Sequence, residues 1–255
     1  DQNPKDLEAF LDALNDKVEI SQDIVVLPGM VADSLEAASP FENVHDKLLI
    51  DATSIVSTDP RSPDEPLEGS YNQPTPQWRQ RGTASPPFEG LEAVEALEGV
   101  RQARLLRPNM LVVSTSIKGT PSPRTGQHEG DDAQESQRLE QIIQLRNLIW
   151  QLDSDKNLRW LFITNDDLDM THTKARRRLL WQLTARFDVG RGLTFDEGRD
   201  RLCWDATTPI PSEEHGVRRW PAVTLHDEET LAKVAAHPEL KKYEWPPHLS
   251  FGGPE

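Results

Sequence analysis

The sequence predicts an α/β fold, with a mostly parallel sheet flanked by helices in a layered sandwich and an irregular proline-rich linker. The first observation is an alternation of short apolar runs with amphipathic segments, which is typical of strands joined by helices. The second is the long segment Gln134–Leu152, whose apolar side chains recur at helical spacing. The third is that apolar runs such as residues 158–164 end directly in polar turns. Together these patterns predict one sheet with helices on its faces.

Each expected element follows from periodicity and from its flanking turn residues. Helices are expected at Pro4–Lys17, Leu91–Leu97, Gln134–Leu152, Thr173–Phe187 and Asp227–Ala236. Strands are expected at Asp23–Leu27, Lys47–Ile50, Val100–Leu106, Asn109–Ile117, Leu158–Thr164, Gly192–Phe195 and Arg201–Trp204. The dipeptide Pro28-Gly29 predicts the end of the first strand, and Gly99 predicts the end of the second helix.

Composition divides the chain into four segments, at residues 1–56, 57–87, 88–245 and 246–255. The second is a linker or an arm, because the stretch Ser54–Pro87 is rich in Pro, Ser, Asp and Glu and has few large apolar side chains. Tyr71 and Trp78 are its best candidate anchors. The chain begins without methionine, at a helix entry formed by Asn3 and Pro4, which predicts the carboxy-terminal part of a longer protein.

The charge balance excludes two classes of partner. The formal net charge is −15, from 43 acidic and 28 basic residues, whereas nucleic acids and anionic membrane surfaces attract positive proteins.

The expected location of the protein follows from its apolar runs and its cysteine. No apolar run reaches the length of a membrane span. The single cysteine, Cys203, lies in an apolar run and is expected to be a buried, inert thiol in a reducing compartment. We therefore expect a cytoplasmic protein.

An internal repeat is the most informative feature of the sequence. Residues 14–24 align with residues 183–193 at a constant offset of 169 positions, from Leu14 to Leu183, and match in class at the helix end, the basic residue, the apolar position and the acid. Residues 47–53 match residues 201–207 at an offset of 154 positions, and both segments end in Asp-Ala-Thr. The first segment has the longer internal connection, which accounts for the change of offset. The pattern predicts two copies of one helix, strand, strand unit.

The motifs of the second copy resemble those of the carboxy-terminal domain of the UbiD family, the prenylated-flavin-dependent decarboxylases. The resemblance rests on motifs that occur in the family's order, namely Asp166-Asp167-Leu168-Asp169, Leu180-Trp181-Gln182-Leu183, Arg186-Phe187-Asp188 and Asp205-Ala206-Thr207. The segment 105–118 is similar to the strand that opens that domain. In the first copy, residues 1–4, 23–26, 33–39 and 47–53 also look like the family's pattern. By this resemblance, residues 1–56 are a partial first copy and residues 88–245 a second copy.

The resemblance implies a role in a carboxy-lyase that removes CO₂ from an unsaturated or aromatic acid. In the family, prenylated FMN and a divalent metal bind in an upstream barrel that also supplies the catalytic acid and base residues. This chain contains no counterpart of that barrel, so we expect no catalytic, cofactor-binding or metal residue in it. Its partners are expected to be the remainder of such an enzyme or a second copy of this chain. Loop residues from Lys118 to Gln127 are expected to lie near the substrate.

The acidic cluster Asp166, Asp167 and Asp169 supports a different interpretation. A strand that ends in Asp-x-Asp-x-Thr is typical of phosphotransferases in which Asp167 is the nucleophile and Mg²⁺ is bound. With His172, the same acids form a possible metal site. The plainer interpretation is that Asp169 or Thr171 caps the helix that follows. A third alternative is a binding subunit without catalytic activity, whose acidic surface selects its partner.

Other candidates have simpler structural explanations. His128 lies in a polar loop, and the basic run Lys174–Arg178 is expected on a solvated helix face. Leu180 and Trp181 are expected in the core. Asp51 and Asp205 each close an apolar strand, where they cap the following turn or line a cleft.

Overall fold

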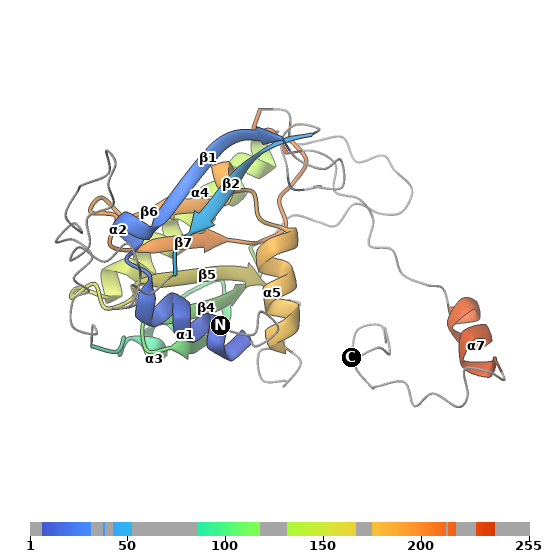
Figure 1. The fold of residues 1–255 in the computed structure, drawn as a ribbon, viewed down its shortest axis with the longest axis horizontal. Coiled ribbons are helices and arrows are strands. Elements are labelled where there is room, and N and C mark those ends of the chain that lie inside the picture. Colours follow the sequence, from blue (N-terminus) through green and yellow to red (C-terminus); the bar gives the residue numbers. More distant parts are fainter. Residues whose placement is uncertain are drawn as a thin grey trace, which may run out of the picture.

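The computed structural model describes residues 7–31, 38, 43–52, 86–117, 132–166, 175–212, 214–217 and 228–237. Its centre is a five-stranded sheet in the order β3-β4-β5-β7-β6 (Figure 1). The strands are β3 (Val100–Arg107), β4 (Met110–Thr115), β5 (Trp160–Asn165), β6 (Leu193–Phe195) and β7 (Leu202–Asp205). The β4-β5-β7 pairings are parallel, and both edge strands are antiparallel to their neighbours. The protein is therefore α/β, with a sheet that is parallel in its middle and mixed overall.

Helices cover both faces of this sheet. The helices are α1 (Leu7–Lys17), α2 (Ile20–Asp23), α3 (Leu91–Glu95), α4 (Asp132–Leu152), α5 (Ala175–Ala185), α6 (Val189–Gly192) and α7 (Glu228–Ala236). In Figure 1, α1 and α5 lie in front of the sheet and α4 lies behind it. Among the described residues, no helix combines the length and apolar character needed to cross a membrane.

Side chains alternate between the two faces because successive residues of a strand point to opposite sides. In β5, Trp160 and Phe162 join one apolar cluster, which includes residues of α1 and α5. Leu161 and Ile163 join the other, which includes residues of α3 and α4. Every residue of β4 and β5 is buried, as expected for central strands covered on both faces.

A second, two-stranded antiparallel ribbon consists of β1 (Ile24–Val31) and β2 (Val44–Ile50). The prediction that Pro28-Gly29 ends the first strand was wrong, because β1 continues to Val31. A shift of pairing register between Leu27 and Met30 accommodates the dipeptide. Gly29 has a φ of +65°, and its N–H donates to the Asp46 carboxylate over 2.9 Å. A proline without an N–H is tolerated at such a bulge.

The structure builds both copies of the sequence repeat from the same elements. The order α1, α2, β1, β2 recurs as α5, α6, β6, β7. The residues of α2 lie 169 positions before those of α6, from Ile20 to Val189, and the strands that follow start in the same register. The first pair of strands begins with Ile24 opposite Ile50, and the second begins with Leu193 opposite Trp204. Both copies contribute to the apolar cluster on the front face of the sheet.

Two predicted apolar faces are oriented differently from expectation. Leu180 and Trp181 were predicted in the core, but they are exposed, and Trp181 retains 51% of its accessible surface. The helix α5 instead buries Leu179, Gln182 and Leu183, since only this side faces the sheet. Arg186 lies over the Trp181 ring at 5.6 Å, which covers part of that ring from solvent.

The helix α4 has a narrower apolar stripe than the sequence suggested. It buries Ile142, Leu145 and Ile149 and exposes Ile143, Leu148 and Leu152. The buried line continues toward the start of the helix through two charged residues, Glu135 and Arg138. Charge is therefore placed where the helix meets the ends of the strands.

Several predictions lie outside the described residues. They concern the linker apart from its last two residues, the loop 118–131, the turn 167–174 and the tail.

We expect Gly192→Ala to lower the free energy of unfolding by about 1–3 kcal/mol, because the added methyl group meets a packed backbone. A Cβ atom at Gly192 would lie 2.6 Å from the Asp205 carbonyl oxygen and 2.8 Å from the Phe187 ring. Gly198→Ala is the matched control, since its Cβ would approach only the ends of the Asp200 and Lys156 side chains and no backbone atom. Equal urea midpoints for the two variants would contradict the expected close approach of α6 and β7.

Candidate functional site

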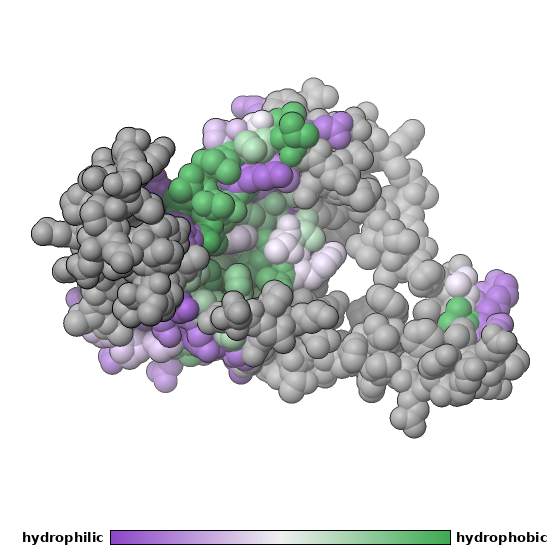
Figure 2. Space-filling view, in the orientation of Figure 1, coloured by the Kyte–Doolittle hydropathy of each residue, from purple (hydrophilic) through white to green (hydrophobic). Residues whose placement is uncertain are grey.

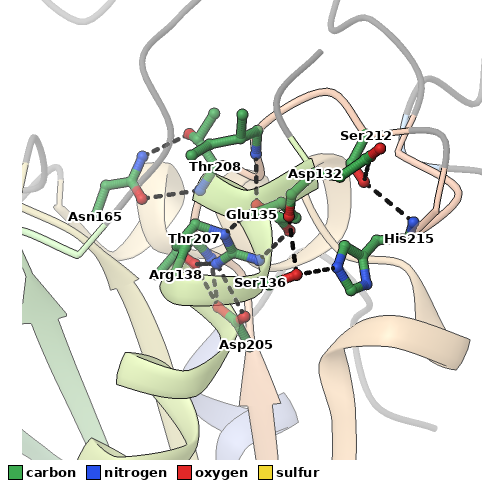
Figure 3. Close-up of polar contacts among 11 residues, drawn as sticks. Asp132, Glu135, Ser136, Arg138, Asn165, Asp205, Thr207, Thr208, Ser212 and His215 are labelled. Carbon is green, nitrogen blue, oxygen red and sulfur yellow. Dashed lines mark hydrogen bonds and ion pairs between the residues drawn. The ribbon is translucent and has the colours of Figure 1, made fainter.

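The candidate site lies at the carboxyl ends of the parallel strands. The strand β5 ends at Asn165 and β7 ends at Asp205, so both side chains lie at the same edge of the sheet. This edge is where open α/β sheets place ligands. The first turns of α4 approach it and supply Glu135 and Arg138 (Figure 3).

Glu135 and Arg138 form a buried ion pair with two parallel contacts. The Arg138 Nε and Nη2 atoms donate to the two Glu135 carboxylate oxygens, each over 2.7 Å. The Glu135 side chain is 0% exposed and that of Arg138 is 3% exposed. The residues are three positions apart on one helix, and this spacing brings their side chains together.

The third nitrogen atom of the Arg138 guanidinium contacts residues at the end of β7. Its Nη1 donates to the Thr207 hydroxyl oxygen over 2.6 Å and lies 3.4 Å from the Asp205 carboxylate. The Thr207 hydroxyl and N–H both donate to the other Asp205 oxygen, over 2.6 and 2.9 Å. Burial alone would lower the pKa of Arg138, but the Glu135 and Asp205 carboxylates raise it overall. Arg138 is therefore held as a cation between two anions.

The chain after β7 is fastened to the same edge by further bonds. The Asn165 amide donates to the Thr208 hydroxyl over 2.6 Å, and the Asn165 oxygen accepts the Thr208 N–H over 3.0 Å. The Ile210 N–H donates to Glu135 over 2.8 Å. The segment 206–212 is thus tied to β5 and α4, which holds the edge of the sheet rigid.

A serine and a histidine meet beside this cluster. The Ser136 hydroxyl lies 2.8 Å from the His215 Nε2 atom, and it donates to the Asp132 carbonyl oxygen over 2.8 Å. The Ser212 hydroxyl donates to the Asp132 carboxylate over 2.5 Å. The Asp132 carbonyl oxygen and the His215 ring nitrogen both lie within hydrogen-bond distance of the Ser136 hydroxyl. These contacts hold Ser212 and His215 against the start of α4.

Two more charged groups lie at the far side of the cluster. Burial lowers the pKa of Arg191, although Asp188 and Asp205 oppose this shift. Burial raises the pKa of the Asp188 carboxyl, and the nearby Arg191 partly offsets the shift. Asp188 caps α6, since one of its carboxylate oxygens accepts the Arg191 N–H over 3.1 Å.

The carboxylates of the ion-pair cluster do not fit a divalent metal. Glu135 and Asp205 both already pair with Arg138, whose charge repels a cation. Within the described ranges, no three His, Cys, Asp or Glu side chains are grouped as a metal site would require.

The structure describes only some of the candidates named from the sequence. Asp166 lies in the turn after β5, whereas Asp167 and Asp169 fall outside the described residues. His128, His172, Lys174 and the loop Lys118–Gln127 also fall outside them, as do the side chains of residues 175–178.

Two predictions can be compared with the structure directly. Cys203 is buried as predicted, and burial raises the pKa of its thiol. Asp205 caps the turn after its strand, as one of its two interpretations proposed, and it also joins the ion-pair cluster.

Sequence reasoning missed Glu135, Arg138, Thr207, Thr208 and the Ser136–His215 contact. A signal existed for the first two, because Glu135 and Arg138 continue the helical spacing of Ile142, Leu145 and Ile149. Ser136 and His215 are far apart in the sequence, and no local pattern indicates their contact.

Fold and site together define an α/β protein with a mixed sheet and a closed ion-pair cluster at its strand ends. In comparisons with known proteins, no protein-family model and no solved structure matches the chain.

Proposed function

We propose that this chain is the carboxy-terminal assembly region of a UbiD-like carboxy-lyase acting on an unsaturated or aromatic acid. In this proposal the sheet and helices form a layered sandwich that closes one wall of an active site, while a separate barrel holds prenylated FMN and its metal. The chain associates with the remainder of such an enzyme or with its own copy in the cytoplasm.

The observation that carries the proposal is the closed state of the cluster at the strand ends. Both Glu135 oxygens, the three nitrogen atoms of the Arg138 guanidinium and the Asp205 carboxylate bond to one another or to adjacent residues. A general acid, base or nucleophile needs a side chain that can reach the substrate. Because the polar groups of this cluster bond to one another within the protein, the cluster has a structural role. Such a role is consistent with a region that supports an active site built elsewhere.

The order of the UbiD-like motifs also supports this proposal. Asp205-Ala206-Thr207 lies at the end of β7, and Asn165-Asp166 lies at the end of the neighbouring strand β5. The first residue of one motif, Asp166, and the motif Asp205-Ala206-Thr207 therefore lie at one edge of the sheet. This edge would face the substrate in the assembled enzyme.

The assembly role is tested by the mass of the recombinant chain in solution. Light scattering over a range of concentrations is expected to report a homo-oligomer, or a complex when a UbiD-like catalytic barrel is added. A monomeric mass at the highest soluble concentration, unchanged by the barrel, would rule out the role.

A metal-dependent phosphotransferase or hydrolase is the second candidate, carried by the placement of Asp166 directly after β5. Calorimetric titration with Mg²⁺ separates the two functions. The assembly proposal predicts the same negligible heat for the native chain and for Asp167→Asn. Heat from the native chain that the substitution abolishes would favour the metal-dependent enzyme.

A further inference from the structure

The outer edge of β2 differs from the equivalent edge in the second copy of the repeat. By the register of the repeat, β2 corresponds to β7 and β1 corresponds to β6. The strand β7 has two neighbours, because β6 pairs with it on one side and β5 pairs with it in parallel on the other. Among the described residues, β2 pairs with β1 alone. In the described part of the chain, the first copy therefore has no counterpart of β5.

Backbone hydrogen bonds show which groups of β2 point toward this edge. The Asp51 N–H donates to the Asp23 carbonyl oxygen over 2.8 Å, so Asp51 and Leu49 direct their N–H groups toward β1. The N–H groups of the alternate residues, Leu48 and Ile50, therefore point away from β1, and that of Ala52 continues the alternation.

The second copy shows what such groups bind. There, the Leu202 N–H donates to the Arg159 carbonyl over 2.9 Å and the Ala206 N–H donates to the Ile163 carbonyl over 2.9 Å. Leu202 and Ala206 are the counterparts of Leu48 and Ala52. Within the described part of the chain, the N–H groups of Leu48, Ile50 and Ala52 have no hydrogen-bond partner. A row of such donors is a template for an added strand.

At the end of β2, the side chains are apolar on the face toward the core, whereas Leu49 lies between the charged Lys47 and Asp51 on the opposite face. Leu48 and Ile50 pack against the front core cluster. On the opposite face, Leu49 is 54% exposed, and its neighbours Val25 and Leu27 are also exposed. Figure 2 shows this apolar surface in green over β1 and β2. A strand that continued the ribbon would meet the apolar core cluster on one face only, whereas β5 is covered on both faces.

We infer that the outer edge of β2 accepts one extended strand, parallel to β2 and apolar on the face that it turns toward the core. Carbonyl groups of the added strand take the N–H groups of Leu48, Ile50 and Ala52. This edge would be one surface through which the proposed assembly could occur. The inference itself rests only on the comparison of the two copies of the repeat. If it fails, the assembly role is still tested separately by the mass measurement described above.

A synthetic peptide with the sequence of Arg159–Asp166 tests this acceptor edge on the full chain. Amide hydrogen exchange is measured residue by residue by NMR, with and without the peptide. In the free chain, exchange should be fast at Leu48 and Ile50 and slow at Leu49. At a peptide concentration of about ten times its Kd, exchange at Leu48 and Ile50 should slow about tenfold, while exchange at Leu49 changes little.

Two N-methylated peptides provide matched controls. In the chain itself, the Ile163 carbonyl faces β7, so the Ile163 N–H faces β7 as well, whereas that of Phe162 faces the opposite side. The peptide methylated at Ile163 should give no protection, and the one methylated at Phe162 should still protect Leu48 and Ile50.

Three results would overturn the inference. The first is the absence of protection by the unmodified peptide. The second is equal protection by both methylated peptides, which would indicate hydrophobic adsorption. The third is protection of Leu48 and Ile50 in the free chain that grows with protein concentration, which would assign the edge to a second copy.

Discussion

Replacing Arg138 with methionine is expected to lower the free energy of unfolding by about 3–5 kcal/mol. The substitution removes a guanidinium that bonds Glu135 through two contacts and reaches Asp205 and Thr207. The carboxylate of Glu135, which is buried completely, would then lack its counter-ion. An unpaired buried charge costs far more than the net value of the pair. Urea unfolding followed by circular dichroism measures this effect.

Arg146→Met is the matched control for this experiment. Arg146 is on the same helix, but it bonds only the neighbouring Asn147 side chain and lies over the Trp150 ring. Its loss is expected to cost about 0.5 kcal/mol, as is usual at a surface. In addition, Glu135→Gln should recover part of the stability lost in Arg138→Met, because it removes the unpaired charge. A loss no greater for Arg138→Met than for Arg146→Met would contradict the buried ion-pair cluster.

Trp160→Ala is expected to destabilise the protein by about 3–5 kcal/mol through the cavity that it leaves. Trp160 is fully buried in β5, where its ring stacks on Phe162 with 6.2 Å between the ring centroids. The apolar cluster that contains it includes residues of both copies of the repeat. Chemical unfolding of the variant provides the measurement.

The comparison variant is Trp181→Ala, because Trp181 is the tryptophan that the sequence placed in the core and the structure places at the surface. It should lose only about 0.5 kcal/mol, which includes its contact with Arg186. If the two tryptophan variants lost equal stability, the assignment of the buried face of α5 would be wrong.

Long periodic elements were predictable from the sequence, and very short ones were not. The apolar side chains of α1, such as Leu11 and Leu14, recur at helical spacing, and β5 is a short unbroken apolar run typical of a buried strand. The helices α2 and α6 have only four residues each, which is too few to show one. The antiparallel edge at β3 had a readable signal, since only Pro108 and Asn109 separate β3 from β4 and so short a link favours a hairpin.

The candidate site was less predictable because its residues meet only in the folded chain. Asp205 was identified from its place at a strand end, but its partner Arg138 lies on a helix 67 residues earlier. The acidic cluster was a candidate metal site because Asp166, Asp167 and Asp169 lie close together in the sequence. Burial decides which charges must be paired, and it depends on how α4 lies against the sheet.

The most direct test of the proposed function is the release of CO₂ by the isolated 255-residue chain. The chain is supplied with prenylated FMN, Mn²⁺ and a panel of unsaturated and aromatic acids, and a complete UbiD-like enzyme serves as the positive control. Our account predicts no turnover above the rate without protein, because the chemistry belongs to a barrel that this chain does not contain. Sustained CO₂ release by the chain alone, without an added protein partner, would contradict it.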